Sequence, residues 1–132
     1  MTSQTPETRH SPPAAAFRQA IENGDVDAAA ALFRTDAVFH SPVVHKPYQG
    51  REALRTILGA VVQVFSDFRY LAEFDGPDGH VLQFRTRVGD RDLEGIDILR
   101  SEGGELTELT VMVRPYSAAT ELRARMAALL TG

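Results

Sequence analysis

Asp97 is the residue whose type and surroundings point most directly to chemistry, because it lies between Ile96 and Ile98. A carboxylate among aliphatic side chains has to be paired, protonated or in contact with a wet cavity, since an isolated buried charge is costly. In a cavity, Asp97 would supply or receive a proton. On an outer surface it would be a solvated acid or an ion-pair partner of Arg85 or Arg100. The residue pattern leaves both alternatives open.

His40 and Ser41 form a second chemical group, and His45 follows a few residues later. Histidine is the side chain that most often acts as a general base near neutral pH, so we expect His40 or Ser41 to assist Asp97 in catalysis. In a regular strand the two histidines would face opposite sides, but Pro42 interrupts that regularity. The alternative for both histidines is a partly exposed, hydrogen-bonded side chain. No third ligand has suitable spacing for a metal, and we predict none.

Several further side chains are candidates for the lining of a ligand pocket. Aromatic residues suit an apolar pocket, although such residues more often belong to a core. Arginines on the strands offer guanidinium groups for a ligand or for a surface ion pair. Aliphatic residues on the face of Asp97, or alternating along the last strand, complete the set. The predicted pocket residues are Phe17, His45, Tyr48, Tyr70, Arg85, Leu99, Met112 and Arg114.

The composition excludes several classes of function. The chain has 132 residues, of which 43% are hydrophobic, and a formal net charge of -4. It contains no cysteine, which excludes disulfides, thiolate zinc sites and cysteine nucleophiles. The basic residues are scattered rather than gathered in a stripe, so we expect no nucleic-acid partner. No apolar run approaches the ~20 residues of a membrane span, so we expect no membrane partner either.

The N-terminal segment differs from the rest of the chain. Residues 1–12 hold no large aliphatic side chain after Met1 and predict a mobile tail. The segment also lacks the apolar core of a secretory signal, so the expected location is cytoplasmic. Residues 13–132 are expected to form one domain, because no linker or repeat divides them.

The spacing of apolar residues predicts the helices that position these groups. The first helix begins at Pro13 and ends at Asn23-Gly24. Asp25 is the expected N-cap of a second short helix that carries Phe33 on its apolar side. Two further helices are predicted over 51–65 and 117–130.

Between and after these helices the residues favour strands. The expected strands cover 35–45, 68–74, 80–88, 93–100 and 105–113. Their turn-linked spacing predicts an antiparallel meander. Helices followed by a sheet and a last helix indicate the α+β class. A long curved sheet wrapped over helices forms a half-open cone, whose interior is a natural small-molecule cavity.

The segments AIENGDVDAAAALFRTDAVFHSPV, YQGREALRTIL and LEGIDILRSEGGELTELTVMVRP, in this order and spacing, resemble the nuclear-transport-factor-2-like superfamily and its SnoaL-like branch. The likeness covers about residues 13–130. It implies a cystatin-like α+β roll in which a cone-shaped, curved antiparallel or mixed sheet wraps around the N-terminal helices. This fold carries isomerases, epoxide hydrolases, polyketide cyclases and non-catalytic binders, so the fold alone does not decide the function.

The resemblance permits a test for one activity. Ketosteroid isomerases of this fold use a tyrosine and a buried aspartic acid as oxyanion donors, and a second aspartate as base. By motif spacing these positions correspond to Phe17, Asp97 and Ser41 of this chain. Phe17 has no hydrogen-bond donor, and a serine without an activating partner is a poor base. Ketosteroid isomerase chemistry is therefore not expected.

Two hypotheses about function remain. The first is a cofactor-independent acid/base isomerase or cyclase that acts on a hydrophobic cyclic compound, with Asp97 moving the proton. The second is a ligand-binding or dimeric interaction module with the same apolar pocket and no chemistry. One acid alone in the cone favours a binder, whereas an acid with a base or a second donor favours an enzyme. For either, we expect a homodimer formed through an apolar outer sheet face.

Overall fold

The computed structural model describes residues 12–131, so the predicted tail lies, apart from Pro12, outside the described residues. Helix α2 covers Pro12–Glu22 and helix α3 covers Val26–Ala31. The Asp25 side chain caps α3 by accepting a hydrogen bond of 3.0 Å from the backbone N–H of Ala28. Gly24 adopts a positive φ of 70°, which glycine tolerates in the turn between the two helices.

One six-stranded sheet forms the body of the protein, with the order β2-β1-β6-β5-β4-β3. Strands β1 and β6 pair in parallel, and all the other neighbours are antiparallel, so the sheet is mixed. The strands are β1 (Phe33–His40), β2 (Tyr48–Gln49), β3 (Phe65–Gly76), β4 (Gly79–Val88), β5 (Arg91–Glu102) and β6 (Glu105–Arg114).

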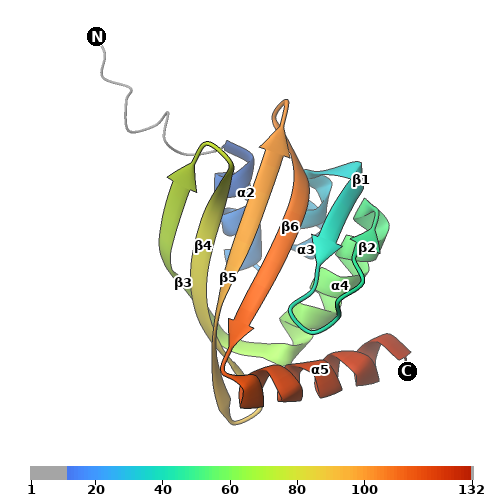
Figure 1. Cartoon of the computed structure of the whole chain (residues 1–132), viewed down its shortest axis with the longest axis vertical. Helices are drawn as coiled ribbons and strands as arrows, with labels where there is room; N and C mark the ends of the chain where they lie inside the picture. The colour runs from blue at the N-terminus through green and yellow to red at the C-terminus, as the bar shows by residue number, and fades with distance from the viewer. Residues whose placement is uncertain (1–11, 132) are drawn as a thin grey trace.

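The helices lie on one side of the sheet. Helices α2, α3 and α4 (Arg51–Val64) cover its concave side, and α5 (Tyr116–Thr131) crosses one end (Figure 1). Helix α4 has its apolar residues at helical spacing and buries Leu54, Ile57 and Leu58. The α+β fold class and the curved sheet wrapped around helices are thus as the sequence predicts.

The two faces of the sheet differ in burial. Along β4 and β5 the residues alternate between buried and half-buried positions, as expected for strands with one face on a core. Leu82 and Phe84 of β4 and Leu93 and Leu99 of β5 are almost fully buried. Strand alternation puts Leu93, Gly95 and Leu99 on the face of Asp97, and all three are buried with it.

Three element boundaries differ from the sequence-based expectations. Phe33 begins β1 rather than closing the second helix, and its side chain is fully buried. Tyr48 and Gln49 lie outside the expected strands, but they pair with β1 as strand β2. Strand β1 ends at His40, because the chain turns there before Pro42.

Candidate functional site

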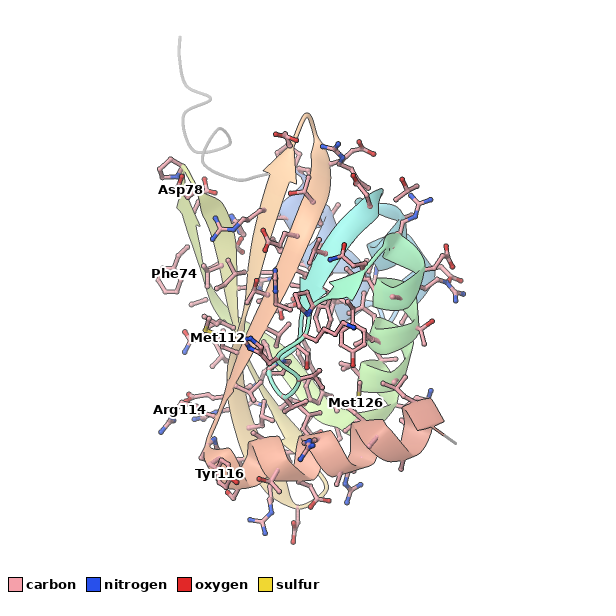
Figure 2. The ribbon with its side chains drawn as sticks, turned by 45° about the vertical axis from the view of Figure 1, so that its right-hand side comes forward. Phe74, Asp78, Met112, Arg114, Tyr116 and Met126 are labelled. Carbon is pink, nitrogen blue, oxygen red and sulfur yellow. The ribbon has the colours of Figure 1, made fainter. Side chains whose placement is uncertain are left out.

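A cavity of about 900 Å³ lies between the concave face of the sheet and the helices α2, α4 and α5. Its wall is mainly apolar, which suits a hydrophobic small molecule. From the sheet side it is lined by Phe39, Phe68, Phe84, Leu109 and Val111, and from the helices by Phe17, Ile57 and Met126 among others. In Figure 2, Met126 of α5 lies on the inner side of the sheet.

The buried polar centre of this cavity is a hydrogen-bonded pair, Asp97 and Tyr70. The Tyr70 hydroxyl donates to Oδ2 of Asp97 over 2.9 Å, and Asp97 is only 7% exposed. Burial raises the pKa of Asp97 from 3.8 to about 7, and the hydrogen bond from Tyr70 opposes that rise. Burial and the neighbouring Asp97 raise the pKa of Tyr70 well above 10. Near neutral pH, Asp97 is therefore poised between its acid and carboxylate forms.

Strand register explains how these two residues meet. Tyr70 on β3 pairs with Phe84 on β4, and Phe84 pairs with Gly95 on β5, two residues before Asp97. A Cβ at Gly95 would lie 2.5 Å from Cζ of Phe84 and 2.8 Å from the Met112 carbonyl oxygen. Because Gly95 has no side chain, the Phe84 ring of β4 can pack against the backbone of β5 at this position. Phe68 adds an edge-on contact to Tyr70, with ring centroids 4.9 Å apart.

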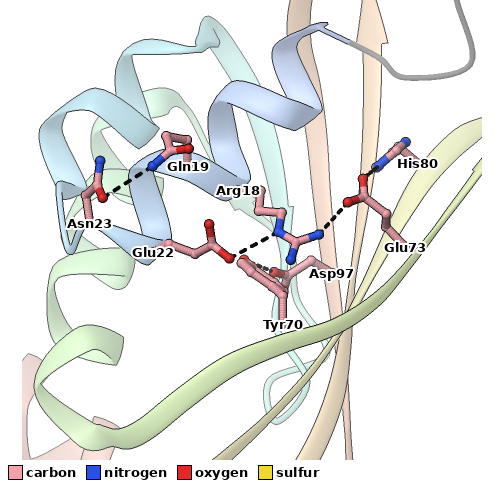
Figure 3. A network of polar contacts seen from close by, with 8 residues as sticks. All are labelled: Arg18, Gln19, Glu22, Asn23, Tyr70, Glu73, His80 and Asp97. Atoms are coloured by element: carbon pink, nitrogen blue, oxygen red, sulfur yellow. Dashed lines mark hydrogen bonds and ion pairs between the residues drawn. The ribbon is translucent and has the colours of Figure 1, made fainter. Parts of the chain in front are cut away.

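A charged network joins helix α2 to this pair (Figure 3). The Arg18 guanidinium lies over the Tyr70 ring, 5.5 Å from its centroid. Its Nε donates to Oε2 of Glu22 over 3.1 Å, and its Nη1 donates to Glu73. The second oxygen of Glu73 lies 2.9 Å from Nε2 of His80. Arg18 is therefore held between two carboxylates, directly above the tyrosine that contacts Asp97.

The far end of this network is a buried histidine. His80 is 2% exposed, and its Nδ1 lies 3.0 Å from Oδ1 of Asp75. Although burial alone would raise the pKa of Glu73, its hydrogen bonds with His80 and Arg18 lower it below the ordinary value. Glu73 is therefore a stable carboxylate bridge between β4 and α2.

A model of the SnoaL-like domain family matches residues 14–109, which is most of the chain. The chain belongs to the SnoaL-like family. It has the nuclear-transport-factor-2-like fold that its sequence resembles. No curated protein matches this sequence.

Solved structures support the family and the fold. A cystatin-like protein from Silicibacter pomeroyi is 32% identical, with a TM-score of 0.88 over 93% of this chain and 88% of that one. A steroid delta-isomerase from Pseudomonas aeruginosa is 37% identical, with a TM-score of 0.86 over 90% of this chain and 89% of that one. A protein of unknown function from Cytophaga hutchinsonii, called NTF2-like after nuclear transport factor 2, is 18% identical, with a TM-score of 0.63. It covers 80% of this chain and 89% of its own, and shows the fold alone.

Within this SnoaL-like domain, five of the residues predicted from the sequence line the cavity: Asp97, Ser41, Phe17, Tyr48 and Tyr70. Their roles in binding or catalysis stay predictions. Ser41 has a structural task, because its Oγ accepts hydrogen bonds from the backbone N–H groups of Val43 at 3.0 Å and Val44 at 3.2 Å. This bonding shapes the turn after β1 and gives the hydroxyl no activating base.

Four other predicted residues lie on the outer face of the sheet, and their expected place in the cavity is corrected. His40 contacts Glu108, with Nε2 and Oε2 2.5 Å apart, and Met112 is 54% exposed. Arg85 and Arg114 both donate to Glu94. Figure 2 shows Met112 and Arg114 on the outside of the sheet. Strand alternation is the cause, since each side chain points away from the inward-facing residue beside it.

Two more predictions are corrected for different reasons. His45 lies exposed in the loop between β1 and β2 and does not line the cavity. Leu99 does share the inner face with Asp97, but it is 1% exposed and belongs to the packed core rather than to the cavity wall.

Helix α2 carries the polar residues that the sequence analysis missed. Glu22 lines the cavity, and Arg18 connects it to Tyr70 and Glu73. The available signal was the i, i+4 spacing of Arg18 and Glu22, which places both on one side of a helix. Such pairs are common on solvated surfaces, so the spacing alone does not predict a site. The packing of α2 against the sheet is what brings Arg18 and Glu22 to the cavity.

Two kinds of structural feature are absent from residues 12–131, the part of the chain that the structure describes. No group of three or more His, Cys, Asp or Glu side chains in this part of the chain is arranged to hold a metal ion. No helix in this part is long and apolar enough to cross a membrane.

Proposed function

We propose that this SnoaL-like protein is a cofactor-independent acid/base enzyme, an isomerase or cyclase that acts on a hydrophobic cyclic ketone. The observation that carries the proposal is a buried acid, Asp97, with a pKa near 7 at the polar end of an apolar cavity. Perturbed carboxyl groups in cavities are typical of catalytic acids and bases. The 37% identical steroid delta-isomerase favours this substrate class, and it weighs against the expectation from Phe17 and Ser41 that isomerase chemistry of this kind is absent.

The Tyr70–Asp97 pair suggests how the proposed proton transfer to a ketone proceeds. Tyr70 occupies one oxygen of Asp97 as a donor, so in the acid form the other carboxyl oxygen carries a proton that is available to a ligand. A ketone oxygen next to that proton gains a hydrogen bond that strengthens as negative charge develops on it. Loss of an adjacent C–H proton then yields an enol, which an isomerase reprotonates elsewhere and a cyclase adds to a second carbonyl.

A deuterium-exchange experiment tests this proposal. Testosterone, menthone and α-tetralone are incubated in deuterated buffer, and exchange of their α-protons is followed by NMR. We expect the protein to accelerate exchange, and Asp97→Asn to reduce the rate by about 10²–10⁴-fold. Asp92→Asn is the matched control, because Asp92 is an exposed aspartate on the same strand. Absence of exchange by the wild-type protein with every ketone would contradict the proposal.

A non-catalytic binding module is the second candidate. It is favoured by Phe17 and Ser41, which occupy positions where the resemblance implies a donor and a base. A thermal-shift series with the same ketones separates the two candidates, because a ligand at ~100 times its Kd adds about 2.7 kcal/mol of stability. Stabilisation without any proton exchange would identify a binder.

We also propose that a second copy of the chain covers the outer face of the sheet. Phe74 and Met112 are 59% and 54% exposed there. Strand register places Ile98 and Ile96 between them, across neighbouring strands, which makes an apolar patch rather than isolated side chains. Light scattering should show a dimer that Met112→Glu converts to a monomer. Tyr116→Glu, at an exposed residue on α5, should leave the dimer intact.

A further inference from the structure

We propose that Glu22 is the general base of this site and that Arg18 is its positioning residue. The inference rests on the proposed function, in which Asp97 is the proton donor to a ketone. It supplies the proton acceptor that such a reaction requires, and it takes that group from helix α2 rather than from the strand end where the resemblance implies a base.

Glu22 is the carboxylate best placed for this role. It is the last residue of α2, and it lines the same cavity as Asp97 and Tyr70. Its Oε2 accepts the hydrogen bond from Arg18, whereas its Oε1 has no hydrogen bond or ion pair with any other residue in 12–131. One oxygen thus fixes the group, and the other is available to accept a proton.

Glu22 also interacts with the tyrosine that contacts the acid. After burial and Asp97, the charge of Glu22 is a further cause of the raised pKa of Tyr70, so Glu22 and Tyr70 interact electrostatically. Figure 3 shows Glu22 of α2 beside the Tyr70–Asp97 pair of the sheet. A proton donor and a proton acceptor therefore lie on opposite sides of one cavity, the helix side and the sheet side.

Arg18 contacts both Glu22 on the helix side of the cavity and Tyr70 on the sheet side. It lies one helical turn before Glu22, so their side chains meet on the same side of α2. Its guanidinium also rests on the Tyr70 ring and is anchored through Glu73 to the buried His80. An arginine with this many contacts restricts the rotation of the Glu22 carboxylate, which is the condition for a base that acts at a defined carbon atom.

The proposed step balances without a cofactor. Glu22 takes a proton from the carbon next to the ketone, and the electrons of that C–H bond form a carbon–carbon double bond. The carbonyl π electrons move to the ketone oxygen, which receives the hydrogen bond or the proton of Asp97. In a β,γ-unsaturated ketone the enol is a conjugated dienol, so return of the proton from Glu22 to the γ carbon regenerates the carbonyl as the α,β-unsaturated isomer. The same return restores both carboxyl groups.

The position that the resemblance assigns to a base does not compete for this role. The Ser41 hydroxyl is engaged with the backbone N–H groups of Val43 and Val44, and His40 points to Glu108 on the outer face. The cavity lining includes two side-chain carboxyl groups, those of Asp97 and Glu22, among residues 12–131. A base at Glu22 therefore makes the site an acid and base pair, the feature expected of an enzyme.

The decisive measurement is the α-proton exchange rate of Glu22→Gln with testosterone, menthone and α-tetralone. Glutamine keeps an oxygen for Arg18 but is not a base, so the rate should fall about 10²–10⁴-fold. The matched control is Glu121→Gln, which removes the same partner from an i, i+4 glutamate–arginine pair outside the cavity. The control should exchange at the wild-type rate. Added formate should restore part of the rate in Glu22→Ala, an effect that a structural role does not produce.

Arg18 is tested by the kcat and KM of the same reaction. Arg18→Gln removes the guanidinium that holds the Glu22 carboxylate, so kcat should fall more than KM changes, and Arg18→Lys should restore part of kcat. A wild-type rate in Glu22→Gln, with a reduced rate in Asp97→Asn, would overturn this inference and leave the proposed enzyme standing. No exchange by the wild-type protein would overturn both.

Discussion

Asp97 and Glu94 lie three residues apart on β5, yet they face opposite sides of the sheet and have opposite electrostatic settings. Asp97 is buried at the cavity, and burial raises its pKa to about 7. Glu94 lies on the outer face, where the hydrogen bond from Arg114 and the nearby Arg85 lower its pKa below the ordinary value. One strand thus holds a carboxyl group that favours its acid form and another that favours its carboxylate form.

The difference shows how one sheet gives two carboxyl groups opposite environments. On the outer face, arginines and glutamates pair across strands within reach of water, as Arg85 and Arg114 do with Glu94. On the inner face, the same alternation places Asp97 beside Tyr70, whose hydroxyl is the one side-chain hydrogen-bond partner of Asp97 among residues 12–131. The environment, rather than the residue type, decides which acid can take part in proton transfer.

The largest difference between the two faces should be in how much buried side chains contribute to the free energy of unfolding. Leu99→Ala on the inner face should lower the free energy of unfolding by about 2–5 kcal/mol, because Leu99 is almost fully buried. Ile98→Ala on the outer face should cost less in the Met112→Glu monomer, since Ile98 is only half-buried. Urea denaturation of both variants in the Met112→Glu background measures the difference. Equal losses would show that the monomer itself covers the outer face as completely as the inner face.

The next effect is on the pH dependence of stability. Below pH 3.8 both states of the chain protonate Asp97, but between 3.8 and about 7 only the folded protein keeps the proton. The free energy of unfolding should therefore decrease by about 1.4 kcal/mol for each pH unit across this range as the pH rises. Asp97→Asn should remove this slope, and Asp92→Asn should keep it. A wild-type stability that does not fall with pH would show that Asp97 is not buried as an acid.

A smaller effect should follow from the hydrogen bond within the pair. Because the bond from Tyr70 opposes the rise in the pKa of Asp97, Tyr70→Phe should move that pKa above about 7. NMR titration of the carboxyl carbon of Asp97 measures the shift. Tyr48→Phe is the control, since Tyr48 also lines the cavity without contacting Asp97. A pKa that falls in Tyr70→Phe would contradict the arrangement.

The smallest effect should come from the outer carboxylate. Because the pKa of Glu94 is lowered in the folded state, its contribution is present above pH 4.5 and lost as the pH falls below it. Its arginine partners are exposed and screened by salt, so Glu94→Gln should leave the stability at neutral pH nearly unchanged. Thermal denaturation at low and high salt checks this. A large loss at neutral pH would mean that Glu94 is covered by another chain.

Much of the fold was predictable from local patterns. Asn23-Gly24 ends the first helix, Asp25 caps the second, and alternation along β4 and β5 separates buried from exposed residues. These features depend on a few neighbouring residues, so the sequence contains them directly. Phe33 was misplaced because its burial suits either the end of a helix or the start of a strand.

The candidate site was predictable only in part. Asp97 was singled out because an acid between two isoleucines is costly unless its surroundings compensate, and the inner face of β5 confirms its burial. His40, Arg85, Met112 and Arg114 were misplaced, because alternation shows that neighbours face opposite sides without showing which side holds the cavity. That choice depends on where the helices pack.

By itself, then, the sequence determined the order of the helices and of the five longer strands, the membership of the SnoaL-like family and the unusual setting of Asp97. Only the tertiary structure decided that Tyr70 reaches Asp97 across the intervening β4, and that Arg18 brings Glu22 to the same cavity. The physical reason is the sequence distance over which each interaction acts. Helix caps and strand alternation act between neighbours in the chain, whereas the pKa of a buried acid depends on side chains that only folding brings within a few ångströms.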